Sequence, residues 1–431
     1  MSLLENVRKG ISLWRREGFG ALKLAIARRA IVEQSGLDIW SAYRSEATAL
    51  VNNFDFSASD VAASRLLHQQ HPGPVSIKSV TWFIPDFNHA YYGGIYTILR
   101  LAAHMAKYHG VQNQFALVGS FDTSVIAAKI GEAFPELANS PVLRVGFAGG
   151  VEALAPTDAA IATLWTTAYF VLRFNKTARK FYFIQDCEPL FYPAGSTHAQ
   201  VEATYRFGFY GLCNTPALKD IYEDQYQGQA TFFYPCVDTN IFHAEKRRER
   251  SEGEPYRLFF YGRPGHPRNG FELGIAALRK LKRRLGKRVQ ILCAGDDWDA
   301  AAYGAQGVVE NLGMLPYEET GDLYRSCDAG FVMMFTRHPS YLPFEMMACG
   351  CSVVTNYNPW TTWLLKDGEN CLLSLPSATS LADRLEEALL DEELRLKIGK
   401  TSSQLIKSQF SNWHEQLEKV YGWMCDPDGQ G

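Results

Sequence analysis

The sequence contains no C-x-x-C pair, and its nine cysteines are an odd number scattered from Cys187 to Cys425. This pattern argues against a disulfide framework and against a cysteine-based zinc site, because both need closely spaced or paired cysteines. We therefore predict reduced, buried thiols in a cytoplasmic protein.

A clear basic excess is also missing, since the formal net charge is -3. Phosphate-backbone binding normally needs such an excess, so nucleic acid is not expected as a partner. We find no secretory signal peptide and no uninterrupted apolar run of about 18 residues, so no bilayer-spanning segment is predicted.

The first 30 residues depart from this balance. They hold seven Lys or Arg against two Glu, interleaved with apolar residues such as Trp14 and Phe19. A basic amphipathic segment of this kind can lie on an anionic membrane leaflet, here the inner face of the cell membrane. The alternative is an ordinary helix that packs on the protein and leaves one face in solvent.

A chain of 431 residues with 47% hydrophobic content is expected to form more than one domain. Short apolar runs such as "SVTWFI" (79–84) and "KFYFIQD" (180–186) alternate with segments of helix length. This alternation predicts a parallel sheet covered by helices on both faces. It is interrupted by the charged stretch 243–256, which we interpret as an interdomain linker, and then resumes from "RLFFYG" (257–262).

We therefore predict an α/β protein with two doubly wound, Rossmann-like domains that face a cleft. The expected division is a helical extension at 1–75, a first domain at 76–250, a second domain at 251–405 and a C-terminal helix at 406–431 that packs back on the first domain. In such sheets the ligand lies beyond the carboxyl ends of the strands.

The strongest candidate site in the second domain lies between Phe259 and Leu281. A strand ends, Gly262 allows close backbone approach, and Arg263 and Arg268 precede a helix that starts near Gly270. Two guanidinium groups beside a helix N-terminus suit a diphosphate. The alternative is a pair of surface arginines at a turn.

The matching feature of the first domain is "HAYYGGIYTILRL" (89–101). Gly93 and Gly94 let the chain pass close to an anionic ligand at a helix start. The segment departs from the fingerprint G-x-G-x-x-G, which argues against NAD. His89, in the same loop, is a candidate sugar contact, whereas His104 on the following helix is expected to be structural.

Glu345 lies at the start of a hydrophobic helix in the second domain. We expect Ser340 to cap this helix and Pro343 to occupy its first turn, where the helix dipole stabilises a carboxylate such as Glu345. Because the helix follows the fourth strand of its domain, its N-terminus should face the cleft. There Glu345 could accept hydrogen bonds from the hydroxyls of a nucleotide ribose, or it could act only in capping.

Two further groups of acidic residues need an interpretation. Asp186 and Glu188 follow a strand in "FIQDCEP" and could orient an acceptor hydroxyl or act as a base, or could equally cap the next segment. Asp296, Asp297 and Asp299 form a literal D-x-D in "DDWD", which can chelate a metal. We interpret these three as a polar turn and predict no metal site.

The second domain resembles the donor domain of retaining glycosyltransferases of family 4, which have the GT-B fold. The "GR" strand end, the turn before "EETGDLYRSCD" and "EMMACGCSVV" carry this similarity over residues 256–390. The segments "FYFIQDCEPLFYPAG", "YGRPGHPRNGFELGIAAL" and "HPSYLPFEM" are similar to bacterial rhamnosyltransferases of the WsaF type.

The resemblance implies roles for several residues. Arg263 and Arg268 would hold the donor diphosphate, with Gly262 and Tyr341 in the same site. Glu345 would hold the ribose, and the loop with Gly93 and Gly94 would face the sugar phosphate. Arg337 stands where the family has a second Glu, eight residues before Glu345. Without that acid a glucose- or mannose-type donor is less expected, and a 6-deoxy sugar is compatible.

The resemblance therefore implies transfer of a sugar, expected to be L-rhamnose from dTDP-L-rhamnose, with retention and without metal or other cofactor. The acceptor would be a hydroxyl of a surface polysaccharide or a lipid-linked glycan. Arg263, Arg268 and Asp186 are the candidate catalytic residues, and Glu188 is a candidate acceptor contact. Two alternatives stay open: a GT-B nucleotide-sugar epimerase, and a non-catalytic subunit of polysaccharide assembly.

Overall fold

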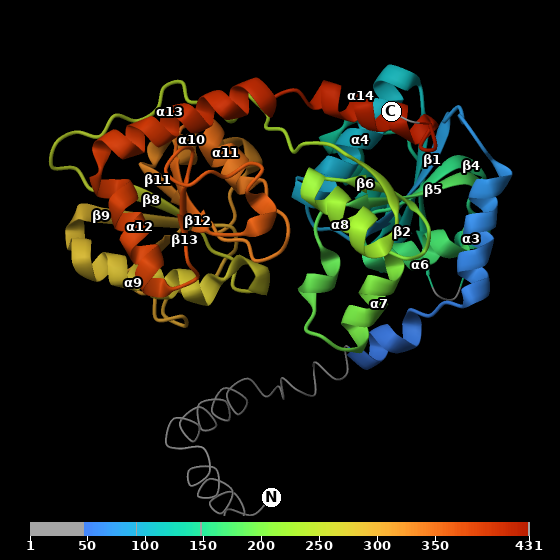
Figure 1. Cartoon of the computed structure of the whole chain (residues 1–431), viewed down its shortest axis with the longest axis horizontal. Helices are drawn as coiled ribbons and strands as arrows, with labels where there is room; N and C mark the ends of the chain where they lie inside the picture. Colours follow the sequence, from blue (N-terminus) through green and yellow to red (C-terminus); the bar gives the residue numbers. More distant parts are fainter. Residues whose placement is uncertain (1–46, 92, 147–148, 430–431) are drawn as a thin grey trace, which may run out of the picture. The chain divides into compact units, whose positions relative to one another are not determined.

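The computed structural model describes residues 47–91, 93–146 and 149–429 (Figure 1). It divides into one unit that ends at Asp55 and a second unit, Phe56–Gly431, that holds every element discussed below. The basic segment of residues 1–30, predicted to lie on a membrane, is outside the described residues. Within the described part of the chain, no helix is both long and apolar enough to cross a membrane.

The first sheet has seven parallel strands in the order β3-β2-β1-β4-β5-β6-β7. Its strands are β1 (Ser79–Pro85), β2 (Gln112–Val118), β3 (Val142–Val145), β4 (Thr157–Ala162), β5 (Thr177–Ile184), β6 (Tyr210–Cys213) and β7 (Gln229–Phe232). Its helices are α3 (Ala58–Gln70), α4 (Gly93–His109), α5 (Thr123–Ala133), α6 (Trp165–Arg173), α7 (Ser196–Thr204) and α8 (Pro216–Tyr226).

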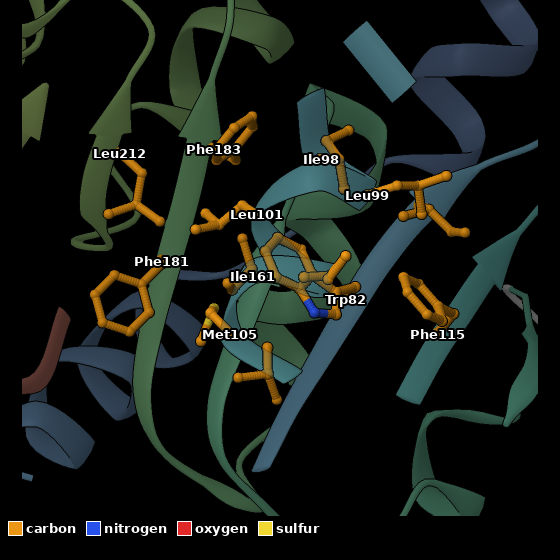
Figure 2. Close-up of a cluster of buried hydrophobic side chains, with 14 of the residues drawn as sticks. Trp82, Ile98, Leu99, Leu101, Met105, Phe115, Ile161, Phe181, Phe183 and Leu212 are labelled. Atoms are coloured by element: carbon orange, nitrogen blue, oxygen red, sulfur yellow. The ribbon is translucent and has the colours of Figure 1, made fainter. Parts of the chain in front are cut away.

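Burial on both faces explains why these strands read as apolar runs. Residues Val80 to Ile84 of β1 are all buried, as expected for a parallel strand covered by helices on both faces. Trp82 belongs to a hydrophobic cluster with Phe115 of β2 and with Met105 of α4 (Figure 2). Leu417, Val420 and Met424 of α14 (Trp413–Cys425) belong to the same cluster, so the last helix packs against the first sheet.

The second sheet has six parallel strands in the order β10-β9-β8-β11-β12-β13. Its strands are β8 (Tyr256–Tyr261), β9 (Val289–Ala294), β10 (Glu310–Asn311), β11 (Ala329–Phe331), β12 (Ser352–Asn356) and β13 (Leu372–Ser374). Its helices are α9 (Phe271–Leu285), α10 (Tyr317–Ser326), α11 (Leu342–Ala348), α12 (Ala378–Leu390) and α13 (Glu392–Gln409).

Alternating side chains on β8 give this sheet two apolar faces. Leu258 and Phe260 pack in a cluster with residues of α9 and α12, whereas Phe259 packs in a second cluster with residues of α10 and α11. The sequence pattern predicted most of these elements. It missed the short strands β3, β6, β10 and β13, which offer too few residues to show a periodicity.

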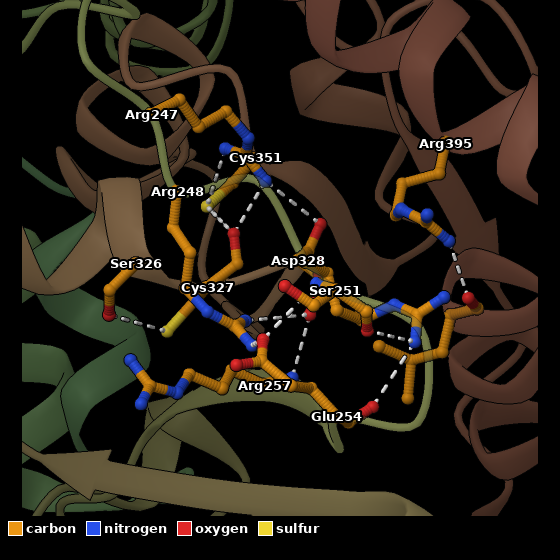
Figure 3. Close-up of polar contacts among 12 residues, drawn as sticks. Arg247, Arg248, Ser251, Glu254, Arg257, Ser326, Cys327, Asp328, Cys351 and Arg395 are labelled. Atoms are coloured by element: carbon orange, nitrogen blue, oxygen red, sulfur yellow. Dashed lines mark hydrogen bonds and ion pairs between the residues drawn. The ribbon is translucent and has the colours of Figure 1, made fainter.

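The connection between the sheets, from Phe233 to Pro255, has neither helix nor strand. Its charged part is nevertheless tied to the second sheet (Figure 3). The Arg247 guanidinium donates to the backbone carbonyls of Cys349 and Cys327, and Arg248 forms an ion pair with Asp328 at 3.6 Å. Arg247 thus satisfies carbonyl groups at the ends of α10 and α11, which a polar linker composition does not reveal.

Candidate functional site

A cavity of about 490 Å³ lies at the carboxyl ends of the strands of the second sheet and is completed by residues from α4 and α14. Its wall includes, from the first-sheet side, His89, Gly93, Tyr96, Thr97, Arg100 and Trp413, and, from the second-sheet side, Tyr261, Arg263, Gly295, Tyr317, Tyr341 and Glu345. This is the edge at which parallel α/β sheets bind ligands, and the predicted cleft is therefore present.

Arg263 occupies the position that its place after β8 predicts. Its Nη1 donates to the hydroxyl oxygen of Tyr261 at 3.2 Å, which orients the guanidinium group along the cavity wall. Its buried Nε has no hydrogen-bond partner among the described residues. A buried cationic donor without a protein acceptor is suited to an anionic ligand, because leaving it unsatisfied is costly.

Arg268 lies in a short 3₁₀ turn at Pro267–Asn269, and it does not line the cavity. Its Nε is 3.9 Å from Oδ2 of Asp186, and its guanidinium lies 4.6 Å from the ring centre of Phe191. The structure thus brings Arg268 together with the end of β5 in the first sheet. Joint binding of one diphosphate by both arginines stays a prediction.

Glu345 lines the cavity from the first turn of α11. Pro343 is in that turn as predicted, but the prediction that Ser340 caps the helix is wrong. The residue at the N-cap position is Tyr341, which makes no side-chain cap hydrogen bond, and Ser340 has a left-handed backbone with φ of 69° and donates its N–H to Nδ1 of His338. The local backbone turns before the helix, which residue preferences alone do not reveal.

The Glu345 carboxyl group has no hydrogen-bond donor among the described residues, and burial raises its pKa to about 8. A carboxyl group with this pKa is mostly protonated at neutral pH and gains from any ligand that supplies hydroxyl donors. The carboxyl group accepts no hydrogen bond from the N–H groups at the start of α11, so the structure does not support the capping interpretation. The ribose interpretation stays a prediction, since the group is open to the cavity.

Tyr341 connects the cavity wall to the first sheet. Its hydroxyl accepts from Nδ2 of Asn214 at 2.8 Å and lies 2.9 Å from Oγ1 of Thr97. A Cβ atom at Gly93, the first residue of α4, would lie 3.5 Å from the Tyr341 ring. Gly93 therefore lies in the cavity wall against Tyr341, whereas a Cβ at Gly94 would face Gln185 and Gly94 does not line the cavity.

The two acidic residues after β5 have different surroundings. Burial raises the pKa of Asp186 to about 6, partly offset by the Thr336 hydroxyl and the Arg268 guanidinium. Glu188 is only 3% exposed and accepts hydrogen bonds from the Trp165 N–H at 2.6 Å and the Tyr182 hydroxyl at 3.1 Å. Because Trp165 is the first residue of α6, Glu188 supports that helix start from inside the domain.

Gly262 is explained by packing within the second sheet. A Cβ atom there would lie 2.3 Å from Sγ of Cys293 and 3.3 Å from the Trp298 ring. The close approach that the sequence predicts at Gly262 is therefore an approach to β9.

The three aspartates of "DDWD" lie in a turn where Asp296 and Asp299 accept hydrogen bonds from backbone N–H groups of the same segment, which agrees with the polar turn that we predicted.

Sequence reasoning missed the residues that close the cavity from α4 and α14. Arg100 lies 4.7 Å from the ring centre of Tyr96 and 4.9 Å from that of Trp413, so its guanidinium group is held between two aromatic rings. Tyr96 and Arg100 are one helical turn apart, a spacing that could have indicated the pair. Trp413 is more than 300 residues away in sequence, and no local pattern connects it with α4.

Comparison with known proteins is consistent with this arrangement. Residues 256–386 match the family described as WsaF, C-terminal domain. The O-antigen biosynthesis protein RfbC of Myxococcus xanthus is 45% identical over 347 residues, which are 80% of this chain and 27% of that protein. This chain thus spans about a quarter of the length of that curated relative.

Solved structures show the same fold at low sequence identity. HepE of Anabaena, in complex with UDP and glucose, has a TM-score of 0.62 and 15% identity over 80% of this chain and 98% of that chain. Sucrose-phosphate synthase of Thermosynechococcus elongatus has a TM-score of 0.60 and 15% identity over the same shares.

The two parallel sheets and the cavity at their strand ends define a protein with the GT-B fold, as predicted. Within that class, its second sheet and the helices around it are similar to the WsaF C-terminal domain.

Proposed function

We propose that this protein is a glycosyltransferase of polysaccharide biosynthesis that binds a nucleoside-diphosphate sugar in the cavity and transfers the sugar to a glycan hydroxyl. The observation that carries the proposal is the convergence of Arg263, Glu345 and Gly93 on one cavity. A guanidinium donor without a protein acceptor, a carboxyl group without a protein donor and a helix N-terminus match a diphosphate next to a ribose. The match to the WsaF C-terminal domain and the name of RfbC support it.

The residues present suggest how the reaction would be accelerated. The bond between the sugar and the diphosphate breaks with negative charge developing on the leaving diphosphate. Arg263 and the N-terminus of α4, which begins at Gly93, would stabilise that charge. We propose that no metal ion is needed at this cavity, because these groups supply the positive potential.

The acceptor side of the reaction involves the end of β5. Asp186 lies beside Arg268, and its raised pKa of about 6 leaves it largely ionised at neutral pH. We propose that Asp186 orients the acceptor hydroxyl or accepts its proton, whereas buried Glu188 only supports α6. Arg268, which does not line the cavity, would then hold the Asp186 carboxylate in place.

The proposed donor is dTDP-L-rhamnose, with retention at the anomeric carbon. Arg337 supports this choice, because the related pattern has a carboxylate there. In the structure its guanidinium group donates to Gln225 Oε1 at 3.0 Å and lies 4.7 Å from the ring centre of Trp360. Among the described residues of the cavity wall, Glu345 is the one acidic side chain. A 6-deoxy sugar has one hydroxyl fewer to satisfy than a hexose.

The proposed acceptor is a surface polysaccharide or a lipid-linked glycan at the inner membrane face. The basic segment of residues 1–30 would hold the protein there. The test compares sedimentation with anionic liposomes of the wild type and of a variant with Arg15, Arg16, Arg28 and Arg29 changed to Glu. The variant should stay in the supernatant, and equal sedimentation of both proteins would refute the membrane role.

Calorimetric titration with dTDP-, UDP- and GDP-sugars tests the donor site. Arg263→Ala should bind the preferred donor about 10- to 100-fold more weakly, because a charge-assisted hydrogen bond contributes about 1.5–3 kcal/mol. Arg284→Ala is the matched control, since Arg284 pairs with Asp383 and Glu386 on the outer surface of α9 and α12. Equal donor affinity of wild type and Arg263→Ala would refute the assignment.

The same titration separates the remaining functions. Selective binding of dTDP-L-rhamnose followed by transfer to a glycan supports the rhamnosyltransferase proposal. Consumption of the donor without an acceptor would indicate a nucleotide-sugar epimerase, and binding without any turnover would indicate a non-catalytic assembly subunit. Binding of a UDP- or GDP-sugar instead would retain the reaction class and refute rhamnose.

A further inference from the structure

A cluster of side chains with metal-binding atoms lies where α14 packs on α4. Nε2 of His104 is 3.2 Å and Nε2 of His109 is 2.9 Å from the same carboxylate oxygen, Oε2 of Glu418. One ligand atom from each of the three residues lies within 4.8 Å of the others. Two imidazoles and a carboxylate are a common set of ligands for Zn²⁺ and other late first-row divalent ions.

The spacing of these atoms is close to that of a tetrahedral site. Bonds of about 2.0–2.1 Å in a tetrahedron place neighbouring ligand atoms roughly 3.3 Å apart. The separations from Glu418 to both imidazoles are near this value without any rearrangement. His414 lies one turn before Glu418 on α14, with its ring centre 5.1 Å from that of His104, but it is outside the group of mutually close ligand atoms. A water molecule can complete a tetrahedral site that has three protein ligands.

The protonation states also suit a metal ion. His104 is 6% exposed, and burial lowers its pKa, so its imidazole is neutral at physiological pH. Although burial acts to raise the pKa of Glu418, the hydrogen bonds from His109 and His104 lower it on balance, so this carboxyl group is ionised. Metal binding would replace the two hydrogen bonds to Glu418, with each imidazole carrying its proton on Nδ1 instead. The ordinary alternative is a hydrogen-bonded histidine pair that only joins two helices.

We propose that His104, His109 and Glu418 bind one Zn²⁺ or a similar late first-row divalent ion, with a water molecule as the fourth ligand. The site is separate from the cavity and does not depend on the proposed transfer reaction. Its effect would be to fasten α14 to α4. Arg100 precedes His104 by one turn on α4, and Trp413 lies on α14 with Glu418, so the ion would also fix the Arg100–Trp413 contact at the cavity wall.

The test uses the full chain, treated with a chelator and then titrated with Zn²⁺ in competition with a chromophoric chelator. We expect one ion per chain. Loss of a supporting group near a metal costs roughly 10- to 100-fold in affinity, so loss of a ligand in His109→Gln or Glu418→Gln should cost roughly 100-fold or more. Both side chains are partly exposed, at 20% and 47%, so these variants should fold. Circular dichroism checks this, and Co²⁺ absorption in the visible range reports the ligand geometry.

His71→Gln is the matched control, because it removes an exposed imidazole at the end of α3 and leaves the cluster intact. It should bind Zn²⁺ as the wild type does. Zn²⁺ should also raise the melting temperature of the wild type in a concentration-dependent way, but not that of the double variant His109→Gln, Glu418→Gln. Failure of the wild type to bind Zn²⁺, or equal binding by the double variant, would refute the site.

Discussion

The hydroxyl groups of Tyr341 and Thr97 lie 2.9 Å apart and join α11 of the second sheet to α4 of the first. Thr97 uses its hydroxyl hydrogen to donate to the Gly93 carbonyl at 2.7 Å, so Tyr341 must be the donor to Thr97. Tyr341 in turn accepts from Nδ2 of Asn214. This chain of hydrogen bonds runs from the end of β6 to the start of α4.

Replacing Tyr341 with Phe should break this chain. Asn214 is fully buried and its Oδ1 already has no partner among the described residues, so its Nδ2 would become unsatisfied as well. The expected loss in free energy of unfolding is about 1–3 kcal/mol, measured by urea denaturation. Tyr303→Phe, which alters a partly exposed tyrosine outside this chain, should change it little. An equal change in the free energy of unfolding for Tyr341→Phe and Tyr303→Phe would show that the hydrogen-bond chain does not stabilise the protein.

Glu345 should make the stability of the protein depend on pH. Burial raises its pKa from 4.5 to about 8, so between these values the folded state binds more protons than the unfolded state. The contribution of Glu345 to stability therefore falls as pH rises from 4.5 to 8. In Glu345→Gln this loss of stability with rising pH should disappear. The melting temperature of the variant, compared with that of the wild type at the same pH, should therefore increase as the pH approaches 8. Asp186 and Glu188 titrate in both proteins and cancel in the difference. A difference in melting temperature between the two proteins that does not change with pH would contradict this prediction.

Donor binding should release a proton if the ionised Glu345 carboxylate accepts the ribose hydroxyls. At pH 7 the free protein holds this group mostly protonated, because its pKa is about 8. Calorimetry in two buffers of different ionisation enthalpy should show release of up to one proton in the wild type and none in Glu345→Gln. Identical proton release by both proteins would place the titrating group elsewhere.

Gly262→Ala should destabilise the second sheet. The new Cβ would lie 2.3 Å from Sγ of Cys293, a distance that forces either the Cys293 side chain or one of the two strands to shift. Overpacking of this kind costs typically about 1–3 kcal/mol in free energy of unfolding. Adding Cys293→Ala removes the clashing sulfur atom, so the double variant should be more stable than the sum of the single effects predicts. If the effects of the two substitutions on the free energy of unfolding were strictly additive, the contact with Cys293 would not be the cause of the destabilisation.

Asp186 should determine the acidic limb of the pH–rate profile. Its pKa is raised to about 6 by burial, and the proposed role needs the ionised form. The rate of transfer by the wild type should therefore fall below about pH 6, and Asp186→Asn should be slow at every pH, by roughly 100-fold or more if Asp186 acts as a base. Glu188→Gln is the comparison, since the Glu188 carboxyl group faces the interior and its replacement should not move this limb.

Much of the fold could be predicted because its signals are local. The apolar run at Ser79–Pro85 indicates a buried strand, and the amphipathic run of α9 indicates a helix. The alternation of such strand and helix segments along the chain predicted two parallel sheets. The end of a strand is also a local signal, so Arg263 and Glu345 could be placed at the ligand-binding edge. Glu188 could not be assigned in the same way, because a carboxylate after a strand is equally compatible with the cavity and with the interior.

The sequence by itself determined which segments form strands and helices and which charged groups lie at the strand ends, since both depend on residues within a few positions of one another. Only the tertiary structure decided that Tyr341 meets Thr97, that Trp413 covers Arg100, and that Glu418 meets His104 and His109. These contacts join residues separated by more than 200 positions, and those between α4 and α14 accompany the packing of both helices in one hydrophobic cluster. No period in a linear sequence encodes which surfaces meet, because that choice is made by the packing of whole elements.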